Sequence, residues 1–277
     1  MKAFVIDVSK CNGCYSCQIA CKDEHCGNDW TPYAKPQPDW GQFWGKLNEY
    51  VRGTVGQGLE EQPVVRMSSK VKMSYVFVPC QHCKDAPCIA ACPEDAIYTR
   101  DDGLVIIDPK KCNGCQLCVD SCPYGCIFYN TSLHLAQKCS GCAHLVDRGV
   151  VFAPRCADNC PTEAIKFGDE AELDLSGAET LHPEYGLTTR VYYKNLPKRF
   201  IAGTVYDPGA KEVVIGATCT LSGDGTGTAT TDGFGDFWFE GLKVGTFSLK
   251  IEAAGKTKTI DAISTEKDVN LGDIALS

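Results

Sequence analysis

The sequence predicts an α+β chain, with a cysteine-rich domain of short helices and hairpins followed by an all-β sandwich. Two observations predict this division. Eighteen of the 19 cysteines lie in the first 160 of the 277 residues, a density that ordinary globular sequences do not reach. The last 80 residues hold one cysteine and consist of short alternating apolar runs separated by glycine turns, which is typical of a β-sandwich.

Composition also sets the expected boundaries. The cysteine-rich domain is expected over residues 1–166, with a cysteine-free insertion at 27–79. A polar connecting segment spans 167–197, and the sandwich spans 198–277. The insertion carries Trp30, Trp40 and Trp44. Two interpretations stay open: the insertion covers the cysteine motifs, or its tryptophans anchor a partner subunit, because Trp is enriched at interface hot spots.

Sixteen cysteines form four groups, here called quartets 1 to 4. They are Cys11, Cys14, Cys17 and Cys21; Cys80, Cys83, Cys88 and Cys92; Cys112, Cys115, Cys118 and Cys122; and Cys139, Cys142, Cys156 and Cys160. Most of their intervals are too short and too regular for disulfides that join separate elements. Zinc motifs are two separated pairs, whereas three of these quartets end in Cys-Pro. The pattern therefore predicts iron–sulfur clusters with all sixteen cysteines as iron ligands.

The spacing within a quartet predicts how the ligands are shared. Three thiolates on one short loop reach different irons of a single [4Fe-4S] cluster. The fourth cysteine follows three residues later, in the next element, and points to the neighbouring cluster. Quartets are therefore expected to work in pairs, and four quartets predict four [4Fe-4S] clusters.

Several residues near the quartets receive other assignments. Three cysteines are left over and are expected to be small buried apolar residues without a role: Cys26, Cys126 and Cys219. Packing or surface roles are expected for His82 and His144, with hydrogen bonds that tune a cluster as the alternative. Lys138 and Arg155 precede quartet 4 cysteines and are expected to raise the potential of one cluster unless solvation cancels their charge. No motif indicates a catalytic residue.

The segment that links quartets 2 and 3 resembles a two-cluster bacterial ferredoxin. Pro93–Ile97 is read as a turn of helix and Asp102–Asp108 as part of a strand hairpin, before Lys111 opens quartet 3. The resemblance pairs quartet 2 with quartet 3 and leaves quartet 1 to pair with quartet 4. It implies four ligand sets: Cys11, Cys14, Cys17 with Cys160; Cys139, Cys142, Cys156 with Cys21; Cys80, Cys83, Cys88 with Cys122; and Cys112, Cys115, Cys118 with Cys92. The first domain is then a tandem ferredoxin-like, four-cluster domain.

A wider resemblance covers residues 1–197. The four quartets, together with Val78–Cys83, Ala86–Cys88 and Val191–Leu196, resemble the iron–sulfur subunit of the DMSO reductase family of molybdopterin oxidoreductases. The resemblance implies an electron-transfer subunit that is not catalytic alone. In such complexes a large partner subunit holds molybdenum or tungsten on a bis-pyranopterin, and the clusters conduct electrons between that site and an external donor or acceptor.

The C-terminal region carries a second resemblance. Thr230–Leu242 and Gly245–Phe247 resemble the collagen-adhesin B-type, or carboxypeptidase-regulatory-like, Ig-like sandwich, which implies a fold and almost no chemistry. We expect the sandwich to help dock the large subunit. Together with Ala136–Cys139 and Cys142–Leu145, it makes the chain similar to small subunits of the pyrogallol–phloroglucinol transhydroxylase type.

One departure from that type shapes the expected reaction. Transhydroxylase small subunits lack a complete third quartet, whereas Cys112, Cys115 and Cys118 are all present here. A redox-neutral hydroxyl transfer needs no row of clusters that leads to an external electron partner. We therefore expect net hydroxylation or dehydroxylation of a phenolic ring, with transhydroxylation as the alternative. Two further functions stay open: the electron subunit of a polysulfide, arsenate or DMSO reductase, and a free polyferredoxin shuttle.

Charge and hydropathy argue against a nucleic-acid-binding protein and against a membrane-spanning protein. The net charge is −8 and no block of basic residues occurs, so nucleic acid is not an expected partner. No apolar run approaches the length of a membrane span, and no signal-peptide core precedes the first cysteine motif. We expect a cytoplasmic location, with co-export beside a twin-arginine partner to the periplasm as the alternative.

Overall fold

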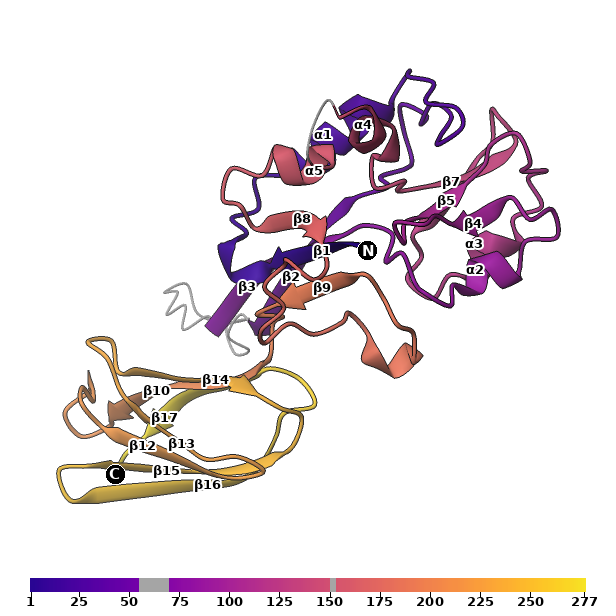
Figure 1. Cartoon of the computed structure of the whole chain (residues 1–277). Coiled ribbons are helices and arrows are strands. Elements are labelled where there is room, and N and C mark those ends of the chain that lie inside the picture. Colours follow the sequence, from indigo (N-terminus) through magenta and orange to yellow (C-terminus); the bar gives the residue numbers. More distant parts are fainter. Residues whose placement is uncertain (55–69, 150–152) are drawn as a thin grey trace. The chain divides into compact units, whose positions relative to one another are not determined.

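The computed structural model describes residues 1–54, 70–149 and 153–277, which form two compact units (Figure 1). Unit 1 comprises Met1–Glu49 and Ser74–Leu196, and unit 2 comprises Tyr50–Met73 and Pro197–Ser277. The middle of the insertion expected at 27–79 therefore belongs to unit 2, and its residues 55–69 lie outside the described part.

Unit 1 contains a three-stranded sheet in the order β8-β1-β9. Strand β1 (Lys2–Asp7) pairs antiparallel with β8 (Ile165–Asp169) and parallel with β9 (Val191–Lys194). The continuous apolar run of β1 is buried on both faces, as expected for a central strand between packed layers. This sheet joins the beginning of the chain to the residues after quartet 4.

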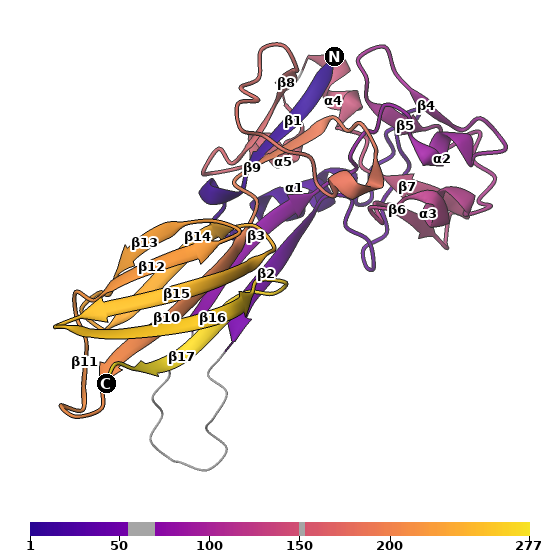
Figure 2. The same ribbon diagram turned by 90° about the horizontal axis from the view of Figure 1, so that it is seen from below.

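Short helices and the loops beside them carry the cysteines of unit 1, and hairpins separate these segments. The helices are α1 (Ser16–His25), α2 (Pro87–Ala90), α3 (Leu117–Ser121), α4 (Ala143–Arg148) and α5 (Arg155–Asp158), with 3-10 turns η1 (Val8–Lys10) and η2 (Pro183–Tyr185). The hairpins are β2 (Lys46–Thr54) with β3 (Lys70–Val78), β4 (Ile97–Thr99) with β5 (Val105–Ile107), and β6 (Ile127–Asn130) with β7 (Leu135–Lys138). Helices α2 and α3 lie beside the β4–β5 and β6–β7 hairpins, while α1 packs on α5 (Figures 1 and 2).

The segment between quartets 2 and 3 confirms the predicted hairpin but not the predicted turn of helix. Residues 93–96 form a non-helical turn, and Ile97 begins β4. Asp95 has a φ of 46°, in the left-handed region, which a right-handed helix does not contain. Strand β4 therefore begins immediately after the turn.

Unit 2 is the predicted all-β sandwich. Strand β10 (Arg199–Asp207) pairs with β11 (Glu212–Val213), β14 (Asp236–Leu242) and β17 (Val269–Ala275). The second sheet has the order β13 (Gly227–Thr230), β12 (Thr218–Gly223), β15 (Thr246–Ala253) and β16 (Lys256–Ser264), whose strands lie side by side in Figure 2. Phe237, Phe239 and Phe247 are among the buried residues of the sandwich core. Alternation of buried and exposed residues along β15 matches the period of a half-buried strand.

The far ends of β2 and β3 are tied to this sandwich by ion pairs. Arg52 Nη1 donates to Asp268 Oδ1 at 3.2 Å, and Lys70 pairs with Asp236. The Lys72 ammonium lies 4.7 Å from the centre of the Trp238 ring. These described ends of the two strands are therefore part of unit 2.

Candidate iron–sulfur sites

Three hollows in unit 1 are each lined by four quartet cysteines. Site A contains Cys11, Cys14, Cys17 and Cys160; site C contains Cys80, Cys83, Cys88 and Cys122; and site D contains Cys92, Cys112, Cys115 and Cys118. Each contains three cysteines of one quartet and the last cysteine of another, which is the crossing that the ferredoxin resemblance implies.

A fourth group, site B, consists of four buried cysteines: Cys21, Cys139, Cys142 and Cys156. Burial raises the pKa of Cys21 well above its usual value, and thiolates at Cys139 and Cys142 raise it further. Burial and the same two neighbours also raise the pKa of Cys156. These electrostatic effects join α1, α5 and the residues between β7 and α4 into one site.

Identical loops build the outer sites A and D. Each reads Cys-Asn-Gly-Cys, and in each the asparagine Oδ1 accepts the backbone N–H of the second cysteine, at 3.2 Å from Asn12 and 3.1 Å from Asn113. Gly114 has a φ of 76°, and a Cβ there would lie 2.3 Å from the His134 carbonyl oxygen. Only glycine fits this approach, so the loop stays close to the β6–β7 turn.

The four sites are adjacent in the order A, B, C, D. Three pairs of cysteines from successive sites share an apolar cluster and interact electrostatically: Cys17 with Cys156, Cys80 with Cys139, and Cys88 with Cys118. Within the described residues, Cys14 of site A and Cys115 of site D are the exposed quartet cysteines, whereas site B is fully buried. The two outer sites each have an exposed cysteine, site C has one partly exposed cysteine, Cys122, and site B has none.

The thiols need a positive partner to ionise. Burial raises the pKa of Cys17, Cys83 and Cys88 to about 12, so without a cation they stay protonated at neutral pH. Hydrogen bonds lower the pKa of Cys122 to about 6, with the Cys126 thiol as the largest cause. Since metal binding requires thiolates, sets of four such cysteines around a hollow fit a positively charged, iron-bearing group.

The three left-over cysteines differ from one another. Cys126 is buried as expected, but its Sγ lies 3.3 Å from the Pro79 carbonyl oxygen and its thiol also donates to Cys122. Cys219 is buried in the sandwich core. Cys26 was expected to be a buried apolar residue, and this is wrong: it is partly exposed and donates to Asp39 Oδ1 at 3.0 Å.

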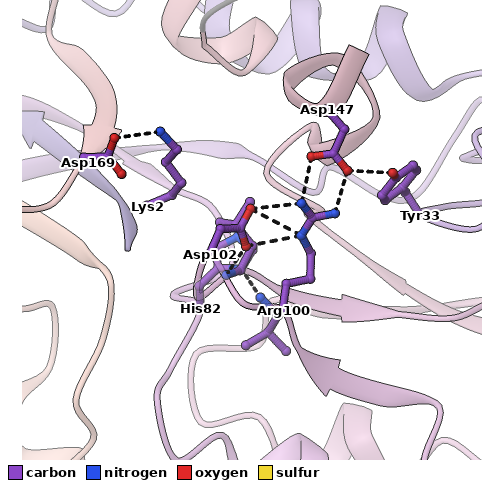
Figure 3. Close-up of polar contacts among 9 residues, drawn as sticks. Lys2, Tyr33, His82, Arg100, Asp102, Asp147 and Asp169 are labelled. Atoms are coloured by element: carbon purple, nitrogen blue, oxygen red, sulfur yellow. Dashed lines mark hydrogen bonds and ion pairs between the residues drawn. The ribbon is translucent and has the colours of Figure 1, made fainter. Parts of the chain in front are cut away.

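His82 and His144 have defined partners other than cysteine side chains. His82 is fully buried, and its Nδ1 accepts the backbone N–H of Val105 at 2.9 Å (Figure 3). His144 Nε2 lies 3.0 Å from Glu24 Oε1, and its ring stacks on Trp30. Burial is the largest cause that lowers the pKa of both rings. Packing and orientation therefore account for their described contacts.

A histidine that the sequence analysis left without a role lies at site B. His25 Nε2 is 3.8 Å from Cys142 Sγ, and the ring packs against Trp44, which is also buried. Cys17, Cys21 and His25 are four residues apart on α1 and therefore share one face of the helix. That spacing is a signal by which the sequence predicts a shared environment for the three side chains.

The two cations expected near one cluster have different surroundings. Arg155 is about one-third exposed and forms ion pairs with Glu24 and Asp158. Lys138 is buried, and its Nζ donates to the carbonyl oxygens of Val105 and Cys139. Burial acts to lower the pKa of Lys138, but neighbouring thiolates outweigh it and the pKa is raised.

An arginine at the β4–β5 turn ties two parts of unit 1 together. Arg100 donates to Asp102 within the turn and to both oxygens of Asp147, at 2.8 and 2.9 Å (Figure 3). Tyr33 donates to the same Asp147 at 2.6 Å. The network connects the turn before site D to helix α4, which follows two cysteines of site B.

Two family models match parts of the chain. Residues 71–170 match a family model described as "4Fe-4S dicluster domain", and residues 201–277 match one described as "Carboxypeptidase regulatory-like domain". The first covers the cysteines of quartets 2 to 4, and the second covers the strands of the sandwich. No helix within the described residues is long and apolar enough to cross a bilayer.

Three relatives extend the comparison. The pyrogallol hydroxytransferase small subunit of Pelobacter acidigallici is 35% identical over 98% of this chain and 98% of the relative. A putative dimethyl sulfoxide reductase iron-sulfur subunit of Halobacterium salinarum is 34% identical over 69% of this chain and 78% of the relative. A polypeptide of the anaerobic dimethyl sulfoxide reductase of Escherichia coli is 35% identical over 61% and 74%, respectively.

Proposed function

Because the protein belongs to the iron–sulfur, electron-transfer subunits of molybdopterin oxidoreductases, we propose that it carries four [4Fe-4S] clusters between a large molybdopterin subunit and an external partner. The observation that carries the proposal is the continuous order of sites A to D, with an exposed cysteine at each end. Such an order suits entry of electrons at one end and exit at the other.

In this proposal the sixteen quartet cysteines hold the clusters and no residue of the chain is catalytic. When bound, each cluster supplies one-electron redox chemistry. The chain's residues bury the cysteines of site B, orient the loops through asparagine and glycine, and donate hydrogen bonds to thiolates such as Cys122. These contacts set spacing and potential, while the partner carries out the reaction.

The partner of the chain is proposed to be a large subunit with a molybdenum or tungsten bis-pyranopterin. Trp40 is 86% exposed, and it is a candidate contact for that subunit because exposed aromatic residues are enriched at interface hot spots. Trp44, by contrast, is buried beside the cysteines, so the insertion also covers a site. The cysteine sites favour a reducing compartment, and we place the complex in the cytoplasm.

The reaction is proposed to be a net hydroxylation or dehydroxylation of a phenolic ring. The likeness to a pyrogallol hydroxytransferase small subunit over nearly the whole chain, sandwich included, supports a phenolic substrate. The complete site D supports electron exchange with an outside partner, since an internal hydroxyl transfer is redox-neutral.

Iron analysis of the anaerobically purified complex tests the cluster count. We expect about 16 iron atoms per chain, a broad visible absorption that dithionite bleaches, and co-purification of a large pterin-containing subunit. About 12 iron atoms per chain, or zinc in place of iron, would contradict the proposal.

A dye-coupled assay tests the class of reaction. The complex is supplied with a viologen dye and either one phenol or two different phenols, and both product and dye oxidation state are measured. Net hydroxylation reduces an oxidised dye, and net dehydroxylation oxidises a reduced dye, in proportion to product. Product formed from two phenols without dye turnover would show transhydroxylation instead.

A further inference from the structure

Lys138 is a buried cation whose surroundings contain thiolates and carbonyl oxygens. Its side chain is 4% exposed, at the end of β7, and the ammonium donates to the Val105 and Cys139 carbonyl oxygens. Within the described part of the chain, no carboxylate forms an ion pair with it. A buried charge is costly unless an opposite charge compensates it.

The ammonium of Lys138 contacts residues of two different sites. The Cys139 carbonyl oxygen that accepts from it belongs to a ligand of site B, and the Val105 carbonyl oxygen belongs to a residue that lines the hollow of site C beside Cys80 and Cys88. Cys80 and Cys139 pack in the same apolar cluster. Lys138 therefore lies where the two inner sites adjoin.

The sequence contains two matched lysines that lack this burial. Lys10 and Lys111 also directly precede a quartet cysteine, Cys11 and Cys112, but both lysines are exposed. Water screens an exposed charge strongly and a buried charge weakly. The three lysines thus have the same side chain and the same position before a cysteine, and they differ in exposure to solvent.

We propose that Lys138 is a shared counter-ion of the two inner clusters, one that raises the reduction potential of both. The inference rests on the proposed function, because it requires clusters at sites B and C. A cluster held by four thiolates is negatively charged and gains further negative charge on reduction. A fixed cation close to both clusters favours the reduced form of each, and net charge is one of the factors that set cluster potential.

Potentiometric titrations followed by EPR on the purified complex test the inference. Lys138→Met keeps the apolar stem and removes the charge; Lys138→Arg keeps the charge; Lys111→Met removes an exposed lysine at the same sequence offset. In Lys138→Met we expect two of the four reduction steps to move to lower potential, each by about tenfold in the reduced-to-oxidised ratio, which is about 59 mV for a one-electron step. Lys138→Arg and Lys111→Met should leave those two steps in place.

Three outcomes would overturn the inference: no shift in Lys138→Met, a shift of only one step, or an equal shift in Lys111→Met. If Lys138→Met loses iron, Lys138→Gln is titrated instead. Loss of iron in both neutral variants with retention in Lys138→Arg supports the counter-ion, whereas loss in all three shows a packing role. Iron content of the unsubstituted complex is measured first, so a wrong cluster count rejects the proposed function separately.

Discussion

Each quartet cysteine provides one sulfur, but the pKa of the thiol differs from one cysteine to another. Burial keeps Cys118 of site D protonated, with a pKa of about 11, while hydrogen bonds lower the pKa of Cys122 to about 6. The Cys-Pro step explains part of this contrast, because the turn after the proline points backbone N–H groups at the preceding sulfur. The same position in quartet 4, Cys160, also has a lowered pKa.

Substitution of one ligand should remove one cluster. For Cys118→Ala we expect a loss of about four iron atoms per chain, because a three-cysteine site no longer matches the ligand count of a [4Fe-4S] cluster. Cys219→Ala is the matched control, since Cys219 is also buried but lies in the sandwich core, and its iron content should be unchanged. Iron analysis with EPR spin counting measures both variants.

Removal of the Arg100 side chain should destabilise unit 1 without touching a thiol. Arg100→Gln breaks the paired hydrogen bonds to Asp147, and hydrogen bonds to charged groups contribute about 1.5–3 kcal/mol. The midpoint for loss of visible absorbance on anaerobic heating should fall by several degrees. An unchanged midpoint, equal to that of the exposed-lysine control Lys84→Gln, would contradict this.

At the scale of elements, helix α1 and the segment through α5 link sites A and B. Helix α1 presents Cys17 to site A and Cys21 to site B; α5 carries Cys156 of site B, and Cys160 of site A follows it two residues after its end. Because the ligands on α1 are four residues apart, a change in helix phase between them acts on only one of the two sites.

An insertion in α1 tests this geometry. One alanine added after Ile19 turns Cys21 by about 100° around the helix axis, away from site B. We expect iron to fall by about four atoms per chain while Cys17 still serves site A. An alanine added after the exposed Gly177, where a Cβ meets no neighbour, should change nothing. Full iron in the α1 variant would show that Cys21 is not a ligand.

The cysteine groups were predictable from sequence because most ligands of a site are local. The three cysteines of a loop are close in the chain, and hairpin β4–β5 fixes the distance to the crossing ligand. The burial of Lys138 and the contact of His25 with Cys142 were not predictable in this way, since both depend on packing between residues far apart. The spacing of the cysteines does not show that the Val105 carbonyl oxygen in β5 accepts a hydrogen bond from Lys138 at the end of β7.

At the scale of the whole molecule, the two units depend on metal to different degrees. The sandwich has its own apolar core of buried strands and contains no quartet cysteine. Unit 1 instead packs its cysteines into three of its apolar clusters, so its core is completed by the groups that the cysteines bind.

Removal of the clusters should therefore unfold one unit and spare the other. After anaerobic chelation of iron, limited proteolysis should degrade residues 1–49 and 74–196 and leave a resistant fragment that begins near residue 197. Mass spectrometry of the fragments identifies it. Equal protection of both units after complete iron loss would contradict the coupling of folding to metal.

The solvent exposure of Cys14 and Cys115 has a chemical consequence. A cluster that is exposed enough to exchange electrons with a partner is also exposed to dioxygen, so oxidative damage should start at sites A and D and reach sites B and C later. A briefly aerated complex would then keep its inner clusters but lose electron transfer through its outer ones. Its turnover number would fall before its total iron content falls by much.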